Sequence, residues 1–310
     1  MKITRRTLLG TGSAGLLTAG LGPILPTRAW ANARLEADGR SLDTLSDGNL
    51  VLPMGFLTAE GVDAAALRPI LEKHGVTGDS YTPDCNVTLL RDGDRVVLFD
   101  VGSGPDFMPS AGKLTEALDA VDLTPDDVTH VVFTHAHPDH LWGLLDEFDD
   151  PIFPEASYMI GRSEWDYWID PETVDTIGEA RASFAVGAQR RLEAVEDRIE
   201  FFDDGAEILP GVAARATFGH TPGHMAFEVA LGGESAMIVG DAIGNHHIAF
   251  ERPEIASGAD QDAEKGIATR VALLDQIAAA KMPMIGFHLP TPGIGRAEKT
   301  DDGYRFVAVE

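Results

Sequence analysis

Cysteine is almost absent from this chain, which has one cysteine, Cys85, among its 310 residues. A single cysteine forms no intramolecular disulfide, so the fold must depend on a buried apolar core instead of covalent links. We interpret Cys85 as a small buried apolar residue; the alternative is a redox-active or metal-binding thiol. The same scarcity argues against a purely structural zinc site, which usually closes on four ligands and often uses cysteine.

Basic residues are also scarce. Lysine and arginine total 24 against 50 aspartates and glutamates, and the formal net charge is −26. Because nucleic acid is a polyanion, a surface this acidic excludes it as a partner. We interpret the acidity as a solvated, soluble surface and not as a docking site for a cationic partner.

Long apolar runs are missing too. Glycines and Pro23 interrupt the apolar stretch that ends at Leu25, so we expect no stable membrane anchor. This stretch follows Arg5-Arg6 and precedes small residues up to Ala33, the pattern of a twin-arginine signal peptide. We therefore expect residues 1–33 to be a signal peptide that the twin-arginine export machinery reads. The mature protein, residues 34–310, would then be a periplasmic enzyme, and losing four basic residues would change its net charge from −26 to −30.

Histidine, in contrast, is concentrated in one short motif. His135, His137, Asp139 and His140 lie within six consecutive positions, directly after the apolar run 131–133. Imidazole is the commonest side-chain metal ligand, and carboxylates bind metals beside it. The run of ligands therefore predicts a metal site at the end of a strand.

Further candidate ligands follow other apolar runs. His220 lies in a Gly-His-Thr-Pro-Gly-His segment, Asp241 ends the run 236–240, and His288 follows the run 284–287. Each lies at or near the end of a predicted strand, as the first motif does. The seven side chains are enough to complete one metal site or two.

The order of these residues resembles the metallo-β-lactamase superfamily, whose pattern is HxHxDH, a lone histidine, an aspartate and a final histidine. The resemblance implies that His135, His137 and His220 hold one metal, that Asp139, His140 and His288 hold a second, and that Asp241 bridges them. Two such metals lie about 3.5–4 Å apart and activate a bridging hydroxide for attack. Zinc is the first expectation, although His/Asp sites also accept Mn, Fe or Co. His224 resembles a residue that orients a ligand loop from behind the metals.

The resemblance also implies an α/β fold: an αββα sandwich with two mixed sheets inside, helices outside and the dinuclear site at one edge. The local patterns agree with this order. Strands over 86–90 and 95–99 flank the turn signal Asp92-Gly93, and strands are expected over 128–133, 206–218 and 225–240. Helices are expected over 63–74 and 261–281, and a further helix start at Thr124-Pro125. We predict a single domain over 34–310 with an N-terminal flap before residue 80. Its mostly helical insertion near 161–200 caps the active site, forms a homodimer surface or is a plain packing insertion.

Within the superfamily, the segments 239–241, 286–295 and 303–307 resemble the methyl parathion hydrolase group, which also contains acyl-homoserine lactonases. We therefore expect hydrolysis of a small-molecule lactone, ester or phosphoester, with Asp139 and Asp241 as catalytic residues. Antibiotic hydrolysis is disfavoured, since true zinc β-lactamases lack the bridging acid. Short lactonases place a tyrosine three residues after that acid, where this chain has Gly244, so leaving-group assistance would come from the metal or Asp139. The expected apolar pocket is lined by Phe56, Phe107, Met108, Trp142 and Phe250.

Two alternatives come from other functional classes. A mononuclear iron enzyme resembling persulfide dioxygenases would need only part of the ligand set, and the complete second set disfavours it. A non-catalytic zinc-binding periplasmic protein would bind metal without hydrolysing any ester. Metal content together with a substrate panel separates both from a hydrolase.

Overall fold

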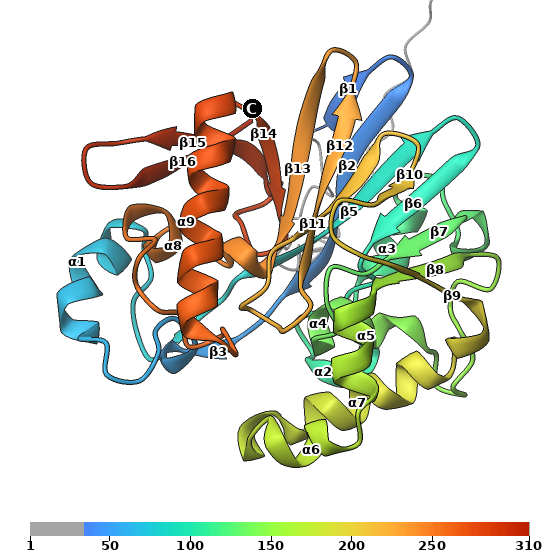
Figure 1. Cartoon of the computed structure of the whole chain (residues 1–310), viewed down its shortest axis with the longest axis horizontal. Coiled ribbons are helices and arrows are strands. Elements are labelled where there is room, and N and C mark those ends of the chain that lie inside the picture. The colour runs from blue at the N-terminus through green and yellow to red at the C-terminus, as the bar shows by residue number, and fades with distance from the viewer. Residues whose placement is uncertain (1–33, 310) are drawn as a thin grey trace, which may run out of the picture.

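Two seven-stranded β-sheets lie face to face in the computed structural model, which describes residues 34–309 of the chain (Figure 1). The first sheet has the order β1 (Arg34–Ala37), β2 (Arg40–Asn49), β5 (Asp84–Asp92), β6 (Arg95–Phe99), β7 (His130–Val132), β8 (Ser157–Gly161) and β9 (Ile199–Phe202). Its strands pair antiparallel up to β6 and parallel from β6 to β9. The sheet is therefore mixed, as predicted.

The second sheet has the order β10 (Glu207–Leu209), β11 (Val212–Ala216), β12 (Met225–Leu231), β13 (Glu234–Gly240), β14 (Pro283–Gly286), β15 (Ile294–Lys299) and β16 (Tyr304–Ala308). Only β13 and β14 pair in parallel, because α9 (Ala263–Ala280) connects them as a crossover. A small third sheet joins β3 (Leu52–Pro53) to β4 (Ser80–Tyr81) in the N-terminal flap.

Helices cover the outer faces of both sheets. The first sheet carries α3 (Leu114–Asp119), α5 (Arg162–Ile169), α6 (Glu172–Thr176) and α7 (Ala182–Glu193), whereas the second carries α8 (Ile248–Glu251) and α9. The flap contributes the short turn η1 (Met54–Phe56) and α1 (Ala64–Lys73), which packs near α8. The predicted αββα sandwich is confirmed.

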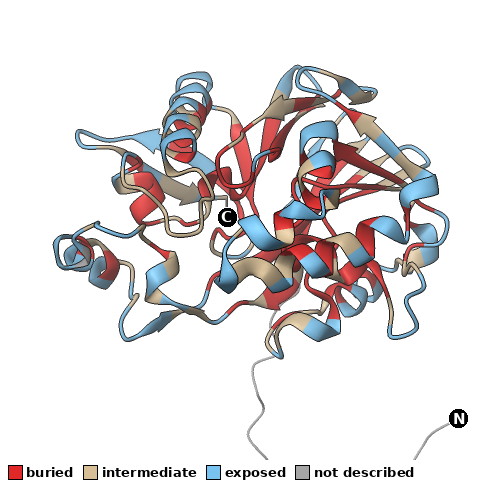
Figure 2. Cartoon of the chain, turned by 60° about the horizontal axis from the view of Figure 1, so that its bottom comes forward, coloured by how far each residue is buried: buried red, intermediate tan, exposed pale blue. Residues whose placement is uncertain are grey.

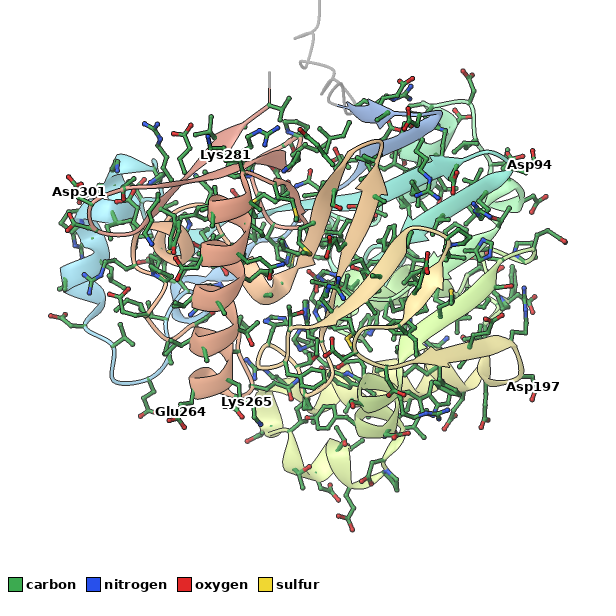
Figure 3. The ribbon with its side chains drawn as sticks, turned by 45° about the horizontal axis from the view of Figure 1, so that its top comes forward. Asp94, Asp197, Glu264, Lys265, Lys281 and Asp301 are labelled. Atoms are coloured by element: carbon green, nitrogen blue, oxygen red, sulfur yellow. The ribbon has the colours of Figure 1, made fainter. Side chains whose placement is uncertain are left out.

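One apolar core lies between the sheets. Val132 and Met159 from the first sheet meet Phe227, Ile238 and Ile285 from the second, all of them buried. Each fully buried side chain of this size contributes about 1.5–3 kcal/mol from the hydrophobic effect. Figure 2 shows the buried strands enclosed by helices that bury only one face. Charged side chains such as Asp94 and Asp301 point outward at the hairpin turns (Figure 3).

Most predicted elements have the expected bounds. The hairpin around Asp92-Gly93 is present, α1 starts after Asp63, whose side chain accepts a hydrogen bond from the Ala65 N–H, and α9 covers the helix predicted over 261–281. The predicted strand regions 206–218 and 225–240 are each a hairpin of two strands, because Gly211 and Gly232 have positive φ at tight turns. The segment 161–200 is mostly helical, as predicted.

The helix start predicted at Thr124-Pro125 is present as a single turn. Thr124 and Asp127 form a capping box, and the 3-10 turn η2 (Pro125–Asp127) follows. Val128 is completely buried and Thr129 donates its N–H to the Val96 carbonyl at 2.9 Å, so the chain then enters the sheet, as the strand predicted over 128–133 requires.

The signal peptide predicted for residues 1–33 lies outside the described residues. Among residues 34–309, no helix combines the length and the apolar character that crossing a membrane would require.

Candidate metal centre

Seven predicted ligands meet at one edge of the sandwich, although they come from four separate loops. His135 and His137 lie in the loop after β7, and Asp139 and His140 follow in α4 (Pro138–Leu141). His220 lies between β11 and β12, Asp241 directly follows β13, and His288 follows β14. The loops converge because these strands end at the same edge of the two sheets.

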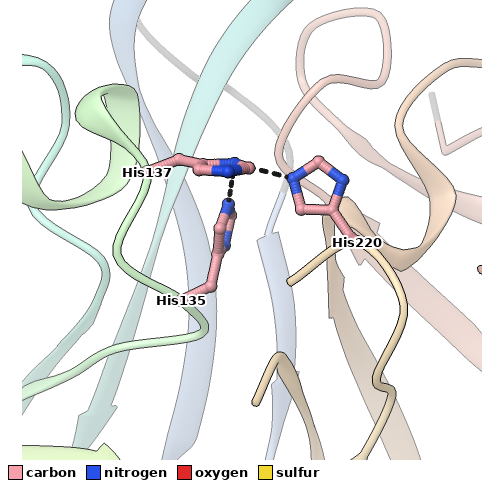
Figure 4. A group of neighbouring side chains, drawn as sticks. All are labelled: His135, His137 and His220. Carbon is pink, nitrogen blue, oxygen red and sulfur yellow. Dashed lines mark hydrogen bonds between the residues drawn. The ribbon is translucent and has the colours of Figure 1, made fainter. Parts of the chain in front are cut away.

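The first group consists of three imidazoles around one point (Figure 4). His137 Nδ1 lies 3.0 Å from His135 Nε2 and 2.9 Å from His220 Nε2. All three side chains are buried. Burial first, and then the neighbouring imidazoles, lower the pKa of both His135 and His137 well below the ordinary histidine value. These rings are therefore neutral, which is the form that coordinates a metal.

The second group faces the first across Asp241. His288 Nε2 lies 3.1 Å from Asp139 Oδ2 and 3.3 Å from Asp241 Oδ2, and His140 Nε2 lies 3.3 Å from Asp241 Oδ1. Asp241 Oδ2 is also 3.4 Å from His220 Nε2, which belongs to the first group. One carboxylate therefore faces both groups, as a bridging ligand must.

The donor set fits two divalent cations. Asp139 Oδ2, His140 Nε2 and Asp241 Oδ1 are buried atoms that complete no hydrogen bond with residues 34–309. Such atoms are costly to bury unless something else satisfies them. Burial alone would raise the pKa of Asp241, but His288 and His140 lower it well below its usual range, so the carboxylate is ionised. Bound cations would supply the missing partners of these three atoms and would balance the negative charge of Asp241.

The histidine rings of the second group face the centre with Nε2, and each forms a hydrogen bond to the protein through Nδ1. His140 Nδ1 lies 2.8 Å from the buried Asp100 carboxylate, and His288 Nδ1 donates to the Asp84 carbonyl at 2.8 Å. The same Asp100 accepts hydrogen bonds from the Thr134 N–H and hydroxyl, both at 2.8 Å. Such contacts fix the tautomer and the orientation of a ligand ring.

His224, which was predicted to orient a ligand loop, does not face the metal centre with a free nitrogen. Its Nε2 accepts a hydrogen bond from the Asp241 N–H at 3.0 Å, while its Nδ1 pairs with the Thr217 hydroxyl at 2.7 Å. The backbone at Asp241 is thereby tied to the loop that carries His220.

Glu164 joins two of the ligand loops and was missed by the sequence analysis. This carboxylate is completely buried and accepts hydrogen bonds from the Ala136 N–H at 3.0 Å, the Thr221 hydroxyl at 2.7 Å and the Gly223 N–H at 3.0 Å. The Trp168 indole donates a fourth, at 2.5 Å. Burial raises the pKa of Glu164, and the four donors oppose that shift. The only feature of the sequence that could have indicated this role is that Glu164 is an acidic residue on an otherwise apolar face of its helix.

A cavity opens over the metal centre, and two of the five predicted apolar contacts line it. Phe56 and Phe107 belong to its wall together with Asp139, Asp241 and His288. Met108, Trp142 and Phe250 do not line it. Phe250 is completely buried against Phe306 in the core beneath α9.

Met108 and Trp142 also lie outside the cavity wall. The Met108 sulfur accepts a hydrogen bond from the Val51 N–H at 3.1 Å, and the Trp142 ring packs beneath the Arg191 guanidinium at 4.5 Å. Both side chains pack against the core of the first sheet. Loop position alone did not indicate which way these side chains face.

Several cavity residues had no signal in the sequence. Tyr81 comes from the flap, Asn245 from the loop after Asp241, and Arg181 and Phe184 from the helical segment 161–200. That segment therefore contributes to the wall of the site, as expected of a cap. Arg181 also donates to the carbonyls of residues 258 and 259, at 2.9 and 3.0 Å.

Cys85 is completely buried and packs in the core of the first sheet, as a small apolar residue would. Its sulfur also lies within 4.8 Å of ligand atoms of Asp139 and His288. Burial raises the pKa of the Cys85 thiol to about 12, so it is protonated at neutral pH.

Known proteins show the same fold and related sequence. The dizinc quorum-quenching lactonase AidC superposes with a TM-score of 0.83 at 25% identity, covering 91% of this chain and 98% of AidC. The hydrolase AbOPH shares the fold, with a TM-score of 0.84 at 24% identity over 91% of this chain and 98% of its own.

The curated relatives match over shorter stretches. The N-acyl homoserine lactonase AttM of Agrobacterium fabrum is 29% identical over 119 residues, which are 37% of this chain and 41% of AttM. A metallo-beta-lactamase domain-containing protein of Xenopus laevis is 34% identical over 138 residues, 44% of this chain and 53% of its own. The chain thus spans about half the length of these relatives, or less. The sequence profile of the metallo-beta-lactamase superfamily matches residues 81–293, a range that includes all seven candidate ligands. The chain therefore belongs to the metallo-β-lactamase superfamily.

Proposed function

We propose that this protein is a dinuclear metal-dependent hydrolase that opens lactones or cleaves related carboxylic esters. The observation that carries the proposal is the position of Asp241, whose Oδ2 lies 3.4 Å from a nitrogen of the first group and 3.3 Å from one of the second. The lactonases among the similar proteins favour the same reaction class. Export to the periplasm remains a prediction for residues 1–33.

The ligand residues would hold two cations, for which zinc is the first candidate. When bound, such cations supply a water of lowered pKa and polarise the bond under attack. Asp241 sets the separation of the two groups, and Asp139 holds the second group through its contact with His288. Leu50, Phe56 and Ile255 line the cavity with apolar surface that suits an acyl chain.

A paired substrate panel tests this proposal. We expect two metal ions per chain by elemental analysis, and turnover of N-acyl homoserine lactones above that of aryl phosphotriesters. The opposite preference would assign the chain to the phosphotriesterases, which is the second candidate because Gly244 lines the cavity where short lactonases place a tyrosine. One iron per chain with no ester hydrolysis would contradict the proposal, and so would bound zinc without any turnover.

Tyr81 is placed to assist the leaving group. It lines the cavity beside Asp139, Asp241 and His288, and its hydroxyl makes no hydrogen bond to any group within residues 34–309. Burial raises the pKa of Tyr81 to about 12, so the phenol keeps its proton and can donate it. A donor of this kind matters for an alkoxide leaving group, which needs a proton, and little for a nitrophenolate, which does not.

We therefore expect Tyr81→Phe to lower kcat for a lactone about a hundredfold, the lower end of what general acids contribute. Hydrolysis of a p-nitrophenyl ester should change little. Tyr304→Phe is the matched control, because it removes a buried tyrosine hydroxyl that bonds Asp275 outside the cavity. Equal losses on both substrates would show that Tyr81 shapes the cavity without donating a proton.

A further inference from the structure

His220 reaches the metal centre through Nε2, and its other nitrogen faces a carboxylate that belongs to no ligand set. His220 Nδ1 lies 3.4 Å from Asp260 Oδ1. The Asp260 side chain is 3% exposed, so this contact is shielded from water. His140 has the equivalent partner in Asp100, at 2.8 Å. Each of the two groups thus contains one histidine backed by a buried acid.

Arg270 holds Asp260 in place. Its Nη1 lies 3.3 Å from Asp260 Oδ2, and the Arg270 side chain is also 3% exposed. The same guanidinium donates through Nε to the Pro253 carbonyl at 3.0 Å and through Nη2 to the Ile255 carbonyl at 2.7 Å. With three separate contacts on a planar group, Arg270 has little freedom to move, and it fixes the carboxylate facing His220.

The backbone around this pair is shaped for close contact. A Cβ added at Gly266 on α9 would lie 2.3 Å from Asp260 Oδ2, and one at Gly219 would lie 2.3 Å from the Gly266 nitrogen. Both glycines therefore leave room for the His220 loop to meet the start of α9. Two backbone hydrogen bonds keep that contact in register, from the Gln261 N–H to the His220 carbonyl at 3.1 Å and from the Asp262 N–H to the Gly219 carbonyl at 2.9 Å.

We propose that Asp260, held by Arg270, is a positioning residue for His220. It accepts the Nδ1–H, so that Nε2 carries the lone pair directed at the metal, and its negative charge strengthens the ring as a donor. This inference rests on the proposed two-metal function. Removing such a carboxylate behind a ligand histidine typically lowers metal affinity about 10–100-fold.

The test is a competitive chelator titration with Zn²⁺, which yields two stepwise affinities for the wild-type protein. We expect Asp260→Ala to weaken one step about 10–100-fold and to leave the other unchanged. Asp260→Asn keeps a hydrogen-bond acceptor without the negative charge. Its Zn²⁺ affinity at that step should lie between those of the wild type and Asp260→Ala. Asp262→Asn is the matched control, because this residue lies two positions along, is exposed, and caps α9 through the Lys265 N–H at 3.1 Å.

A second readout does not depend on affinity. In Co²⁺-loaded wild-type protein, the His220 Nδ1–H should give a paramagnetically shifted proton signal that exchanges slowly, since Asp260 shields it from water. That signal should exchange rapidly or vanish in Asp260→Ala and persist in Asp262→Asn. A signal unchanged in Asp260→Ala, or equal weakening of both Zn²⁺ steps, would overturn the role of Asp260.

Because Asp260→Ala leaves the buried Arg270 without its partner, loss of folding has to be separated from loss of positioning. The double variant with Asp260→Ala and Arg270→Met removes both charges. Weakening of the same single step in this variant supports the inference, and recovery of wild-type affinity contradicts it. A wild-type protein that binds fewer than two Zn²⁺ ions would instead refute the proposed function, so the two failures are distinguishable.

Discussion

Replacing Asp241 by asparagine is expected to lower kcat/KM for a lactone about a thousandfold, equivalent to about 4 kcal/mol of transition-state stabilisation. Bound metal should fall from two ions per chain towards one. Asp241 is the one carboxylate that faces both groups, with contacts of 3.3–3.4 Å to His140, His220 and His288. An amide has nearly the same shape but no negative charge, and only its oxygen can coordinate. The second cation then loses both a ligand and the charge that offsets its own.

This prediction requires kinetics and elemental analysis on the same preparation. Asp301→Asn is the matched control, since Asp301 is exposed in the turn between β15 and β16 (Figure 3) and is not among the candidate ligands. Its metal content and kcat/KM should equal those of the wild type. If Asp241→Asn retained two metals and full turnover, Asp241 would not be the shared ligand and the proposed mechanism would fail.

Replacing Glu164 by alanine is expected to lower the free energy of unfolding by about 3–5 kcal/mol, in the range found when one member of a buried polar network is removed. Four donors lose their acceptor at once: the Ala136 and Gly223 N–H groups, the Thr221 hydroxyl and the Trp168 indole. An unsatisfied buried donor costs about 1–3 kcal/mol, and partial relaxation keeps the total below the sum.

The measurement is urea unfolding of the metal-free protein. Asp166→Ala on the same helix, α5, is the control, because Asp166 is exposed and lies 3.9 Å from Arg162 in a surface ion pair. Such surface changes usually stay within about 0.5 kcal/mol. The Glu164 variant should also bind Zn²⁺ more weakly in the first group, since both loops that supply its histidines lose their common anchor. If Glu164→Ala had the same free energy of unfolding as Asp166→Ala, water would be satisfying the four donors in place of the carboxylate.

The ligand set could be predicted from the sequence because its signal is local. His135, His137, Asp139 and His140 crowd into six positions after an apolar run, and His220, Asp241 and His288 each lie at or near the end of another predicted strand. A strand that ends in a ligand needs no long-range information to be recognised. The layers of the fold were expected from the resemblance to the superfamily, and the order of predicted strands and helices agrees with an αββα sandwich.

Local signals did not indicate the direction in which side chains point. Phe250 was expected in the cavity and lies in the core instead, because residue type and loop position do not specify which way a side chain points.

The sequence by itself determined the seven candidate ligands, because their order along the chain is recognisable, and through the resemblance of that order it indicated the family and the sandwich. Only the tertiary structure decided what surrounds them. Tyr81, Glu164 and Asp260 come from separate elements. Glu164 contacts Ala136, 28 positions away along the chain, Asp260 faces His220, 40 positions away, and Tyr81 shares the cavity with the ligands. Their roles depend on how the flap, the helical cap and α9 pack around the centre, and packing of distant segments leaves no periodic trace in the chain.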